Sequence, residues 1–420
     1  PMNSLPRFIR IRQNFPPTSA LDLRAELDRN FESLRPQITQ GARIAVGVGS
    51  RGITQLAEIV KAVVGLLRSA GANPFIIPAM GSHGGATPEG QRELLASYGV
   101  TEVAMGVPIR DSLEVRQVGT SVDGAPVFCS VEALAADRIL VVNRIKPHTD
   151  FTGALGSGLL KMCVIGLGKQ RGAAAMHLAA SRVGHERAIR GMAEVLLRSA
   201  PILGGVAILE NQYHETARLA VLPREEMATG EDAWLEVARR LMPSLPFDEI
   251  DLLIVDRLGK NISGTGMDTN IIHRSVNGYS SSLLREGRPA PFIRRIFVRD
   301  LTPESHGNAI GIGLADLTTT RLVRSTDLRV TNINALTSLT PQSAKLPIAF
   351  DTDREAIERA LSSLPLPNFG AARIVRIADT LSLVEIDISE PLRSETEKQS
   401  GIVALTPPRE LRFDAEGNLA

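Results

Sequence analysis

Two histidines lie in loops that follow predicted β-strands, and both could carry acid–base chemistry. His83 lies in the sequence GSHGG at 81–85, and His148 ends the sequence KPH at 146–148. Imidazole has an ordinary pKa of about 6.5, so it can give or take a proton near neutral pH. Two imidazoles flanking one substrate could each serve one stereoisomer. The loops therefore predict an acid–base pair.

Lys161 lies between His148 and His177, within the apolar sequence LLKMCVI at 159–165. Burial among apolar side chains would lower the pKa of its amine and make that amine a nucleophile. A lysine in such a segment can equally extend its long stem to water. The local sequence leaves both interpretations open. The P-loop pattern GxxxxGK[ST] is not met, because Met162 follows the lysine.

The sequence GVGSRG at 47–52 matches the dinucleotide fingerprint GxGxxG, between a predicted strand and a predicted helix. A dinucleotide site also needs an acidic residue about 20 positions further on, which binds the ribose. The second strand ends in PAMG at 78–81, without a carboxylate. We therefore predict an anion site at Ser50 and Arg51, for a phosphate or a carboxylate. An NAD-dependent oxidoreductase and a plain turn with a solvated arginine stay open as alternatives.

Alternating strands and helices position these loops. β-rich runs at 42–48, 74–80 and 138–143 alternate with helical patterns at 53–69 and 88–98. This alternation is typical of a parallel α/β sheet. The carboxyl ends of parallel strands meet at one edge of the sheet, where such sheets bind ligands. We therefore expect the three loops to lie at this edge.

A second α/β unit is predicted after the sequence PSLP at 243–246. Its predicted elements are strands at 252–255, 296–298 and 346–350 and a helix at 354–364. The fold class is therefore α/β, with two Rossmann-like domains at 1–245 and 246–390 and the active site in the cleft between them. The tail at 391–420 is expected to fold back on the first domain or to extend from it.

Composition excludes several classes of protein. The chain has 420 residues, is 43% hydrophobic and carries a formal net charge of +1. Basic and acidic residues are interspersed, without the basic stripe that binds nucleic acid. No apolar run approaches the ~20 residues that cross a bilayer. Cys129 and Cys163 are too few for a disulfide framework or a cysteine-rich metal site. We expect a cytoplasmic enzyme without nucleic-acid or membrane partners.

Arg51, His83, His148, Lys161 and His177 together resemble an ordered series in the nickel-dependent lactate racemase family. The resemblance implies that Lys161 carries a covalently attached nickel-pincer nucleotide, which holds nickel through two sulfurs and a ring carbon. His177 then matches the nickel ligand of the family, which completes a square plane of a kind that Ni(II) accepts. His83 and His148 match the proton donor and acceptor. Proteins that synthesise the cofactor are implied partners.

The activity that the resemblance implies is racemisation or epimerisation of a 2-hydroxy acid. The C–H bond beside a carboxylate and a hydroxyl is a poor acid, whereas oxidation to a 2-oxo acid by hydride transfer avoids a carbanion. One histidine would take the hydroxyl proton, and the other would return a proton after hydride returns to the opposite face. The cofactor supplies the hydride chemistry and the protein supplies orientation and charge. A homologue that binds a nucleotide without catalysis stays open as an alternative.

The sequence departs from the family at positions that touch the substrate. Val48 stands where the family has an Asp before its Arg. The loop GTGMDTN at 264–270 resembles the substrate-gripping loop loosely, and His273 and Val276 replace an expected Gln and Lys. We therefore expect not lactate but a larger, hydroxylated acid such as an aldonate. Its predicted contacts are Arg51 in the first domain and, in the second domain, Lys260, Asp268, Asn270, His273 and Asn308. The second-domain residues could equally be turn and capping residues.

Four other residues have weaker assignments. Lys146 and Lys169 are phosphate-binding candidates or solvated lysines. His185 and His214 are predicted to be structural, because neither has an obvious partner in the sequence.

Overall fold

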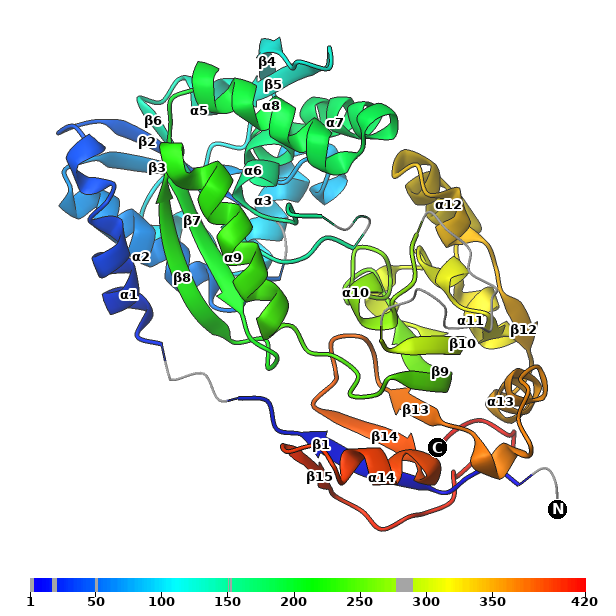
Figure 1. Cartoon of the computed structure of the whole chain (residues 1–420). Coiled ribbons are helices and arrows are strands. Elements are labelled where there is room, and N and C mark those ends of the chain that lie inside the picture. The colour runs from blue at the N-terminus through cyan, green and yellow to red at the C-terminus, as the bar shows by residue number, and fades with distance from the viewer. Residues whose placement is uncertain (1–3, 17–20, 50–51, 150, 152, 277–289) are drawn as a thin grey trace. The chain divides into compact units, whose positions relative to one another are not determined.

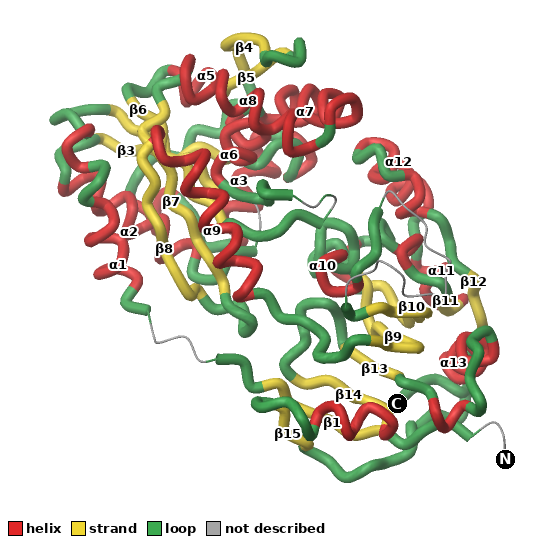
Figure 2. Tube along the Cα trace, viewed as in Figure 1, coloured by secondary structure: helices red, strands yellow, loops and turns green. Residues whose placement is uncertain are grey.

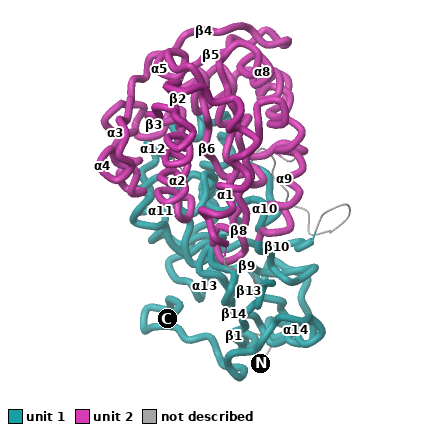
Figure 3. The backbone as a smooth tube through the Cα atoms, turned by 90° about the vertical axis from the view of Figure 1, so that its left-hand side faces the viewer, with its two compact units in different colours: residues 1–16, 243–420 teal, residues 17–242 magenta. Residues whose placement is uncertain are grey.

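The computed structural model describes residues 4–16, 21–49, 52–149, 151, 153–276 and 290–420. The chain divides into two compact units (Figure 3). One comprises Pro17–Met242, and the other combines Pro1–Pro16 with Pro243–Ala420. We describe each unit by itself, and the label of each element is that of Figure 1.

The unit at 17–242 is built on a five-stranded sheet with the order β3-β2-β6-β7-β8. The first four strands of this order are parallel, as predicted, and β8 pairs antiparallel with β7. The chain moves from β2 outward to β3 and then returns to the other side of β2 with β6, which makes a topological switch point. The strands are β2 (Arg43–Val48), β3 (Asn73–Pro78), β6 (Arg138–Arg144), β7 (Ile202–Glu210) and β8 (Thr216–Pro223).

Apolar side chains on the two faces of this sheet enter two separate cores, because side chains alternate along a strand. Ala45 and Val141 join one core, whereas Val46 and Val142 join the other. The first core receives side chains from α7 (Lys169–Val183), α8 (His185–Ser199) and α9 (Met227–Leu241), and the second from α1 (Leu23–Phe31), α2 (Leu56–Ser69) and α3 (Pro88–Ser97). The arrangement is doubly wound (Figure 1).

Smaller elements complete this unit. A hairpin, β4 and β5, was not predicted, and a π-helical turn at Met162–Leu167 continues the short α6. The predicted helix at 53–69 begins at Leu56, because Gln55 adopts the left-handed conformation with a φ of 58°. The remaining elements are α4 (Glu102–Met105), β4 (Val115–Thr120), β5 (Pro126–Ser130), α5 (Val131–Leu134) and α6 (Leu159–Lys161).

The other unit contains an eight-stranded sheet with the order β12-β11-β10-β9-β13-β14-β1-β15. Strands β12 to β13 of this order are parallel, and β14, β1 and β15 extend the sheet in antiparallel pairing. The strands are β1 (Phe8–Gln13), β9 (Glu249–Leu258), β10 (Phe292–Leu301), β11 (Leu317–Thr319), β12 (Ile348–Phe350), β13 (Ile374–Ile377), β14 (Glu385–Ser389) and β15 (Ile402–Ala404). The fold prediction for this unit is therefore correct in part: β9, β10 and β12 lie at predicted strands, whereas β11, β13 and the antiparallel extension were not predicted.

Helices of this unit are α10 (Thr269–Ile272), α11 (Thr320–Ser325), α12 (Leu328–Thr337), α13 (Asp353–Ser362) and α14 (Arg393–Thr396), as Figure 2 shows. The helix predicted at 354–364 is α13. It packs Ala356, Ile357 and Ala360 into a core that also contains Leu252 and Ile374 of the sheet. Among the described residues, no helix is long and apolar enough to cross a membrane.

The ends of the chain correct the predicted boundaries at 1–245, 246–390 and 391–420. Strand β1 lies between β14 and β15, so the first sixteen residues belong to the unit that begins at Pro243. Phe8 and Ile11 of β1 are buried, and Arg10 forms an ion pair with Asp387 of β14. The tail packs on this same unit, where Leu419 enters the core, and not on the unit at 17–242.

Candidate active site

Three loops meet at the carboxyl edge of the five-stranded sheet. They follow β2, β3 and β6, and β2 lies between the other two strands. The loop after β3 carries His83, and the loop after β6 carries His148. Ser50 and Arg51, the predicted anion site, follow β2 but lie outside the described residues. The switch point between β2 and β6 is the position where open α/β sheets bind ligands.

A cluster of rings and one amine forms beside the loop that follows β6. The Nζ atom of Lys161 contacts Nε2 of His148. The His148 ring stacks on Phe151, with 4.4 Å between centroids, and Phe151 stacks on His185, with 4.8 Å between centroids. The rings of His185 and His177 form a T-shaped contact at a centroid distance of 6.5 Å. The structure therefore brings together three predicted residues, His148, Lys161 and His177.

The local sequence explains how these side chains reach one place. Buried Pro147 directs the chain from β6 to His148. Lys161 ends α6, and the π-helical turn carries the chain onward to α7, which presents His177. Gly184, with a φ of 85°, then ends α7 and starts α8 at His185. This φ lies in the region that favours glycine.

Three sets of hydrogen bonds hold the segment that leads to Lys161. The backbones of Lys146 and Ser157 are bonded in both directions, at 2.9 and 2.8 Å. The Asn143 side chain donates to the Gly158 carbonyl at 3.0 Å, and Leu160 N–H donates to the Glu231 carboxyl at 2.8 Å. A short helix has backbone N–H groups without partners at its start, and Glu231 supplies one acceptor for α6. The segment is therefore fixed on both sides of Gly158.

Glu231 is an unusual acid because its side chain is buried. Only 1% of it is exposed, and burial raises the pKa of its carboxyl to about 7, although N–H groups of Leu160 and Leu159 act in the opposite direction. Among the described residues, its Oε1 atom has no hydrogen-bond partner. The carboxyl is thus held in a dry site directly behind the Lys161 segment.

The π-helical turn packs beneath the glycine-rich loops. A Cβ on Gly49 would lie 2.7 Å from the terminal carbon of Met162, and one on Gly81 would lie 2.8 Å from Ile165. In a dinucleotide site the second glycine of the fingerprint lets the backbone approach a pyrophosphate. Here Gly49 accommodates a side chain of the protein itself, which argues against NAD at this turn. Insertions of π-helical geometry are frequent at functional sites.

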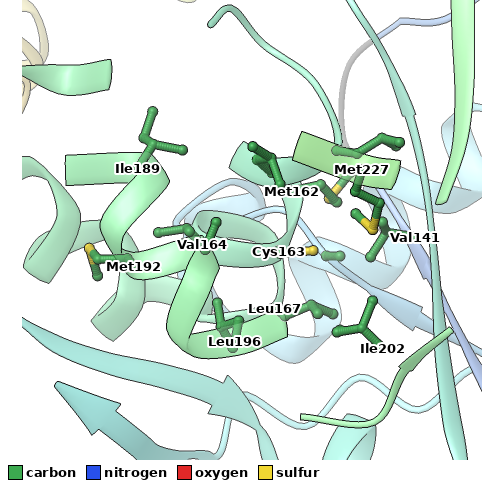
Figure 4. Close-up of a cluster of buried hydrophobic side chains, with 14 of the residues drawn as sticks. Val141, Met162, Cys163, Val164, Leu167, Ile189, Met192, Leu196, Ile202 and Met227 are labelled. Carbon is green, nitrogen blue, oxygen red and sulfur yellow. The ribbon is translucent and has the colours of Figure 1, made fainter. Parts of the chain in front are cut away.

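The apolar surroundings predicted for Lys161 are present, but the lysine itself is only half-buried. Met162, Cys163 and Val164 are buried in the core that Figure 4 shows. Burial raises the pKa of the Cys163 thiol above its ordinary value. The amine of Lys161 lies at the boundary of this core, where it contacts the imidazole of His148.

The loop of His83 is held against the same π-helical turn. The Gln91 side chain donates to the carbonyls of Gly81 and His83, at 3.0 and 3.2 Å. Thr87 caps α3 by accepting from Gly90 N–H at 3.1 Å, as its sequence position predicts. Since Gly81 lies against Ile165, this loop adjoins the turn that continues from Lys161.

Comparison with known proteins agrees with this arrangement. Residues 25–189 match the model of the lactate racemase N-terminal domain. That range contains His83, His148, Lys161, His177 and His185. Residues 25–189 are therefore similar to the lactate racemase N-terminal domain.

A solved structure resembles the whole chain. It is the lactate racemase apoprotein from Thermoanaerobacterium thermosaccharolyticum, with a TM-score of 0.55 and 14% sequence identity. The similarity covers 90% of this chain and 99% of that one. The two proteins therefore share a fold, in which two sheets rich in parallel strands are combined with helices. A search of curated proteins found no match.

Within the range at 25–189, one weaker prediction fails. Lys169 is 1% exposed, and its amine donates to the Pro78 carbonyl at 2.5 Å. Burial lowers the pKa of this amine to about 8. Lys169 therefore holds α7 to the end of β3, and it is neither a phosphate ligand on the surface nor a solvated lysine.

The predicted substrate contacts other than Arg51 all lie in the other unit and make turn and capping contacts. Asp268 caps α10 by accepting from Asn270 N–H at 3.0 Å, and Lys260 donates to the Gly264 carbonyl at 2.8 Å. Asn308 donates to Asn334 at 2.9 Å. His273 ends α10 with a φ of 53°, and burial lowers the pKa of its imidazole. These are the contacts that the sequence offers as the alternative to substrate binding.

Sequence reasoning missed three residues of the candidate site. His185, predicted to be structural, joins the ring cluster, and Phe151 joins it beside His148. Glu231 supports α6 from a helix seventy residues further along the chain. The available signal for His185 was that it follows His177 along the chain and comes directly after a glycine. No local signal pointed to Glu231.

Proposed function

We propose that this protein is a racemase or epimerase of a 2-hydroxy acid that carries a nickel-pincer nucleotide on Lys161. The observation that carries the proposal is the contact between the Lys161 amine and His148, with His177 in the same cluster. The His148 imidazole therefore lies beside any group that is attached to the Lys161 amine. The similarity of residues 25–189 to the lactate racemase N-terminal domain supports the same reading.

The residues present fit the nickel-pincer nucleotide. Lys161 offers an amine that is only half-buried, and His177 offers one half-buried imidazole. Among the described residues no three His, Cys, Asp or Glu side chains are grouped to hold a metal. This agrees with a metal that takes its other donors from an organic group. Lys161 would hold the nucleotide, and His177 would complete the coordination of nickel.

When bound, the nucleotide would accept a hydride from the substrate and return it. The protein contributes proton transfer: His148 or His83 removes the hydroxyl proton from one stereoisomer, and the other histidine protonates the same oxygen afterwards. The Glu231 carboxyl and the Asn143 amide hold the lysine segment in place during this cycle. Ser50 and Arg51 are proposed to bind the carboxylate or the nucleotide phosphate.

We propose a substrate other than lactate, a larger hydroxylated acid. Val276, at the position of an expected lysine, is buried in the core of its unit, with 1% of its surface exposed. Val48, at the position of an expected aspartate, is also fully buried. Neither side chain can bind a carboxylate, so the contacts expected for lactate are not reproduced. Arg51, Lys260, Asp268, Asn270, His273 and Asn308 are the proposed contacts for the larger acid.

The decisive experiment is production of the chain together with cofactor-synthesis proteins, followed by intact-mass and nickel measurements. We expect an added mass located at Lys161 and about one nickel per chain, and interconversion of stereoisomers in a panel of 2-hydroxy acids. Lys161→Ala should abolish the added mass, whereas His177→Ala should keep it and lose nickel. An unmodified Lys161 under these conditions would refute the proposal.

A further inference from the structure

The corner between α7 and α8 brings an additional histidine to the site. His185 is the first residue of α8, directly after the left-handed Gly184. Its ring is nearly parallel to that of Phe151, with 9° between the planes. Phe151 is in turn nearly parallel to His148, with 17° between the planes. We call these three rings, His148, Phe151 and His185, the aromatic column.

The column is the contact that can fix the orientation of His148. His148 lies in a loop, so its backbone does not determine the direction of its ring. Offset stacking at centroid distances of about 4.5 to 7 Å is the preferred arrangement of aromatic rings and selects one ring plane. Phe151 provides this surface on one side of His148, and His185 supports Phe151 from a helix. The rigid element at the end of the column is therefore α8.

His185 also meets the other functional imidazole. The planes of His185 and His177 make an angle of 80° in a T-shaped arrangement. One side chain thus contacts the ring assigned to nickel and supports the ring assigned to proton transfer. The residues His177 and His185 come from adjacent helices, α7 and α8, which are joined only by Gly184.

We propose that His185 is a positioning residue that fixes the ring planes of His148, through Phe151, and of His177, through their T-shaped contact. The effect of this positioning on catalysis rests on the proposed function. Catalytic groups must be held within about 0.5 Å and 10–20° of their productive geometry, and supporting residues provide this accuracy. His185 acts through its flat aromatic shape. Its nitrogens lie in its ring plane, so they do not point toward the face of Phe151.

Three substitutions separate shape from imidazole chemistry. His185→Phe keeps a flat ring, whereas His185→Ala and His185→Gln remove it, and Gln retains a polar group. We expect His185→Phe to keep kcat within about threefold of the original protein. The other two should lose up to about 100-fold in kcat, the order expected when a catalytic group is misplaced by about 1 Å, with a small change in KM. Leu178→Ala, at a side chain that is 55% exposed on α7, is the control.

A second measurement does not depend on cofactor or activity. In the unloaded full-length protein, NMR signals of the His148 and His177 ring protons should shift in His185→Ala and return toward their original positions in His185→Phe. Phe151→Leu removes the middle ring and should shift the His148 signal as His185→Ala does. Failure of the proposed function would remove activity from the original protein but leave these shifts intact.

Two results would overturn the inference. If His185→Phe were as impaired as His185→Ala, the imidazole itself would be needed, and shape would not explain its role. If His185→Ala left both the ring signals and kcat unchanged, His185 would position neither histidine.

Discussion

At the scale of single residues, Glu231 lies in an environment far from the ordinary one of a carboxyl group. Its folded-state pKa of about 7 lies above the ordinary value of 4.5. Between these values the unfolded chain releases the proton while the folded chain keeps it. The contribution of Glu231 to the free energy of unfolding therefore falls as pH rises from about 4.5 to about 7, and it is level above that range.

This predicts a measurable effect of Glu231→Gln. The substitution should remove a pH-dependent loss of stability of about 3 kcal/mol, given 1.36 kcal/mol per unit of pKa. Urea unfolding at pH 5, 6, 7 and 8 measures this loss. Glu226→Gln, at an exposed residue one turn earlier, is the matched control and should leave the pH dependence unchanged. Identical pH profiles for Glu231→Gln and the original chain would contradict the assigned pKa.

The two cysteines give a prediction that is independent of function. Both thiols are buried, and burial raises the pKa of Cys129 to about 12. Burial raises the pKa of Cys163 still further above the ordinary value of a thiol. The reactive species is the thiolate, so both thiols should react very slowly with a disulfide reagent in the folded protein. Addition of denaturant should release two reactive thiols per chain. Rapid reaction of both thiols without denaturant would show that these sites open.

Residues of the candidate site were predictable where neighbours in the sequence define their chemistry. His83, His148 and Lys161 lie in local sequences that favour a site, and the resemblance added His177. His185 was not predictable in this way, because its partner rings, Phe151 and His177, reach it only in the folded chain. The same holds for Glu231, whose partners lie in a distant segment.

At the scale of elements, Gly158 sets the position of α6. A Cβ at this residue would lie 2.3 Å from Oε1 of Glu231, which is not a possible distance. Gly158→Ala should therefore displace either the carboxyl or the start of α6, with a loss of stability of roughly 1–3 kcal/mol and poorer cofactor loading of Lys161. Thermal unfolding and intact mass check the two parts.

Gly65→Ala is the matched control for this substitution. Gly65 lies inside α2, and a Cβ there would meet nothing within 4 Å. Because alanine favours helix over glycine by about 1 kcal/mol, this variant should be slightly more stable. If both substitutions had the same small effect, Gly158 would not be required for close packing with Glu231.

Much of the parallel part of each sheet was predictable from β-rich runs in the sequence, but the short strands β11 and β13 were not. The antiparallel extension was not predictable, because the sequence of a short strand does not indicate which strand it pairs with. Phe8 of β1 pairs with Ser389 of β14, at the opposite end of the chain. Such a pairing is determined by burial of a few apolar residues and by ion pairs such as that between Arg10 and Asp387.

At the scale of the whole molecule, the chain begins and ends in one unit. Residues 4–16 belong to that unit, the chain then forms the unit at 17–242, and it returns at Pro243. A linear division of the sequence could not anticipate this arrangement, because it assigns the first strand to the domain that follows it. The predicted contacts for the acid substrate, other than Arg51, lie in this unit. Its sheet thus depends on the N-terminal strand β1, which lies between β14 and β15.

This dependence predicts that damage to β1 acts on one unit. Ile11 is 1% exposed, and its replacement by alanine should cost about 2–5 kcal/mol, as for other buried large-to-small substitutions. Hydrogen exchange should show loss of protection in β14 and β15, the neighbours of β1, while β2 and β6 keep theirs. Arg12→Ala is the control, because its exposed ion pair with Glu385 contributes at most about 1 kcal/mol. Equal loss of protection in both sheets would mean that the two units unfold together, and the sixteen-residue segment would then stabilise the whole chain rather than one unit.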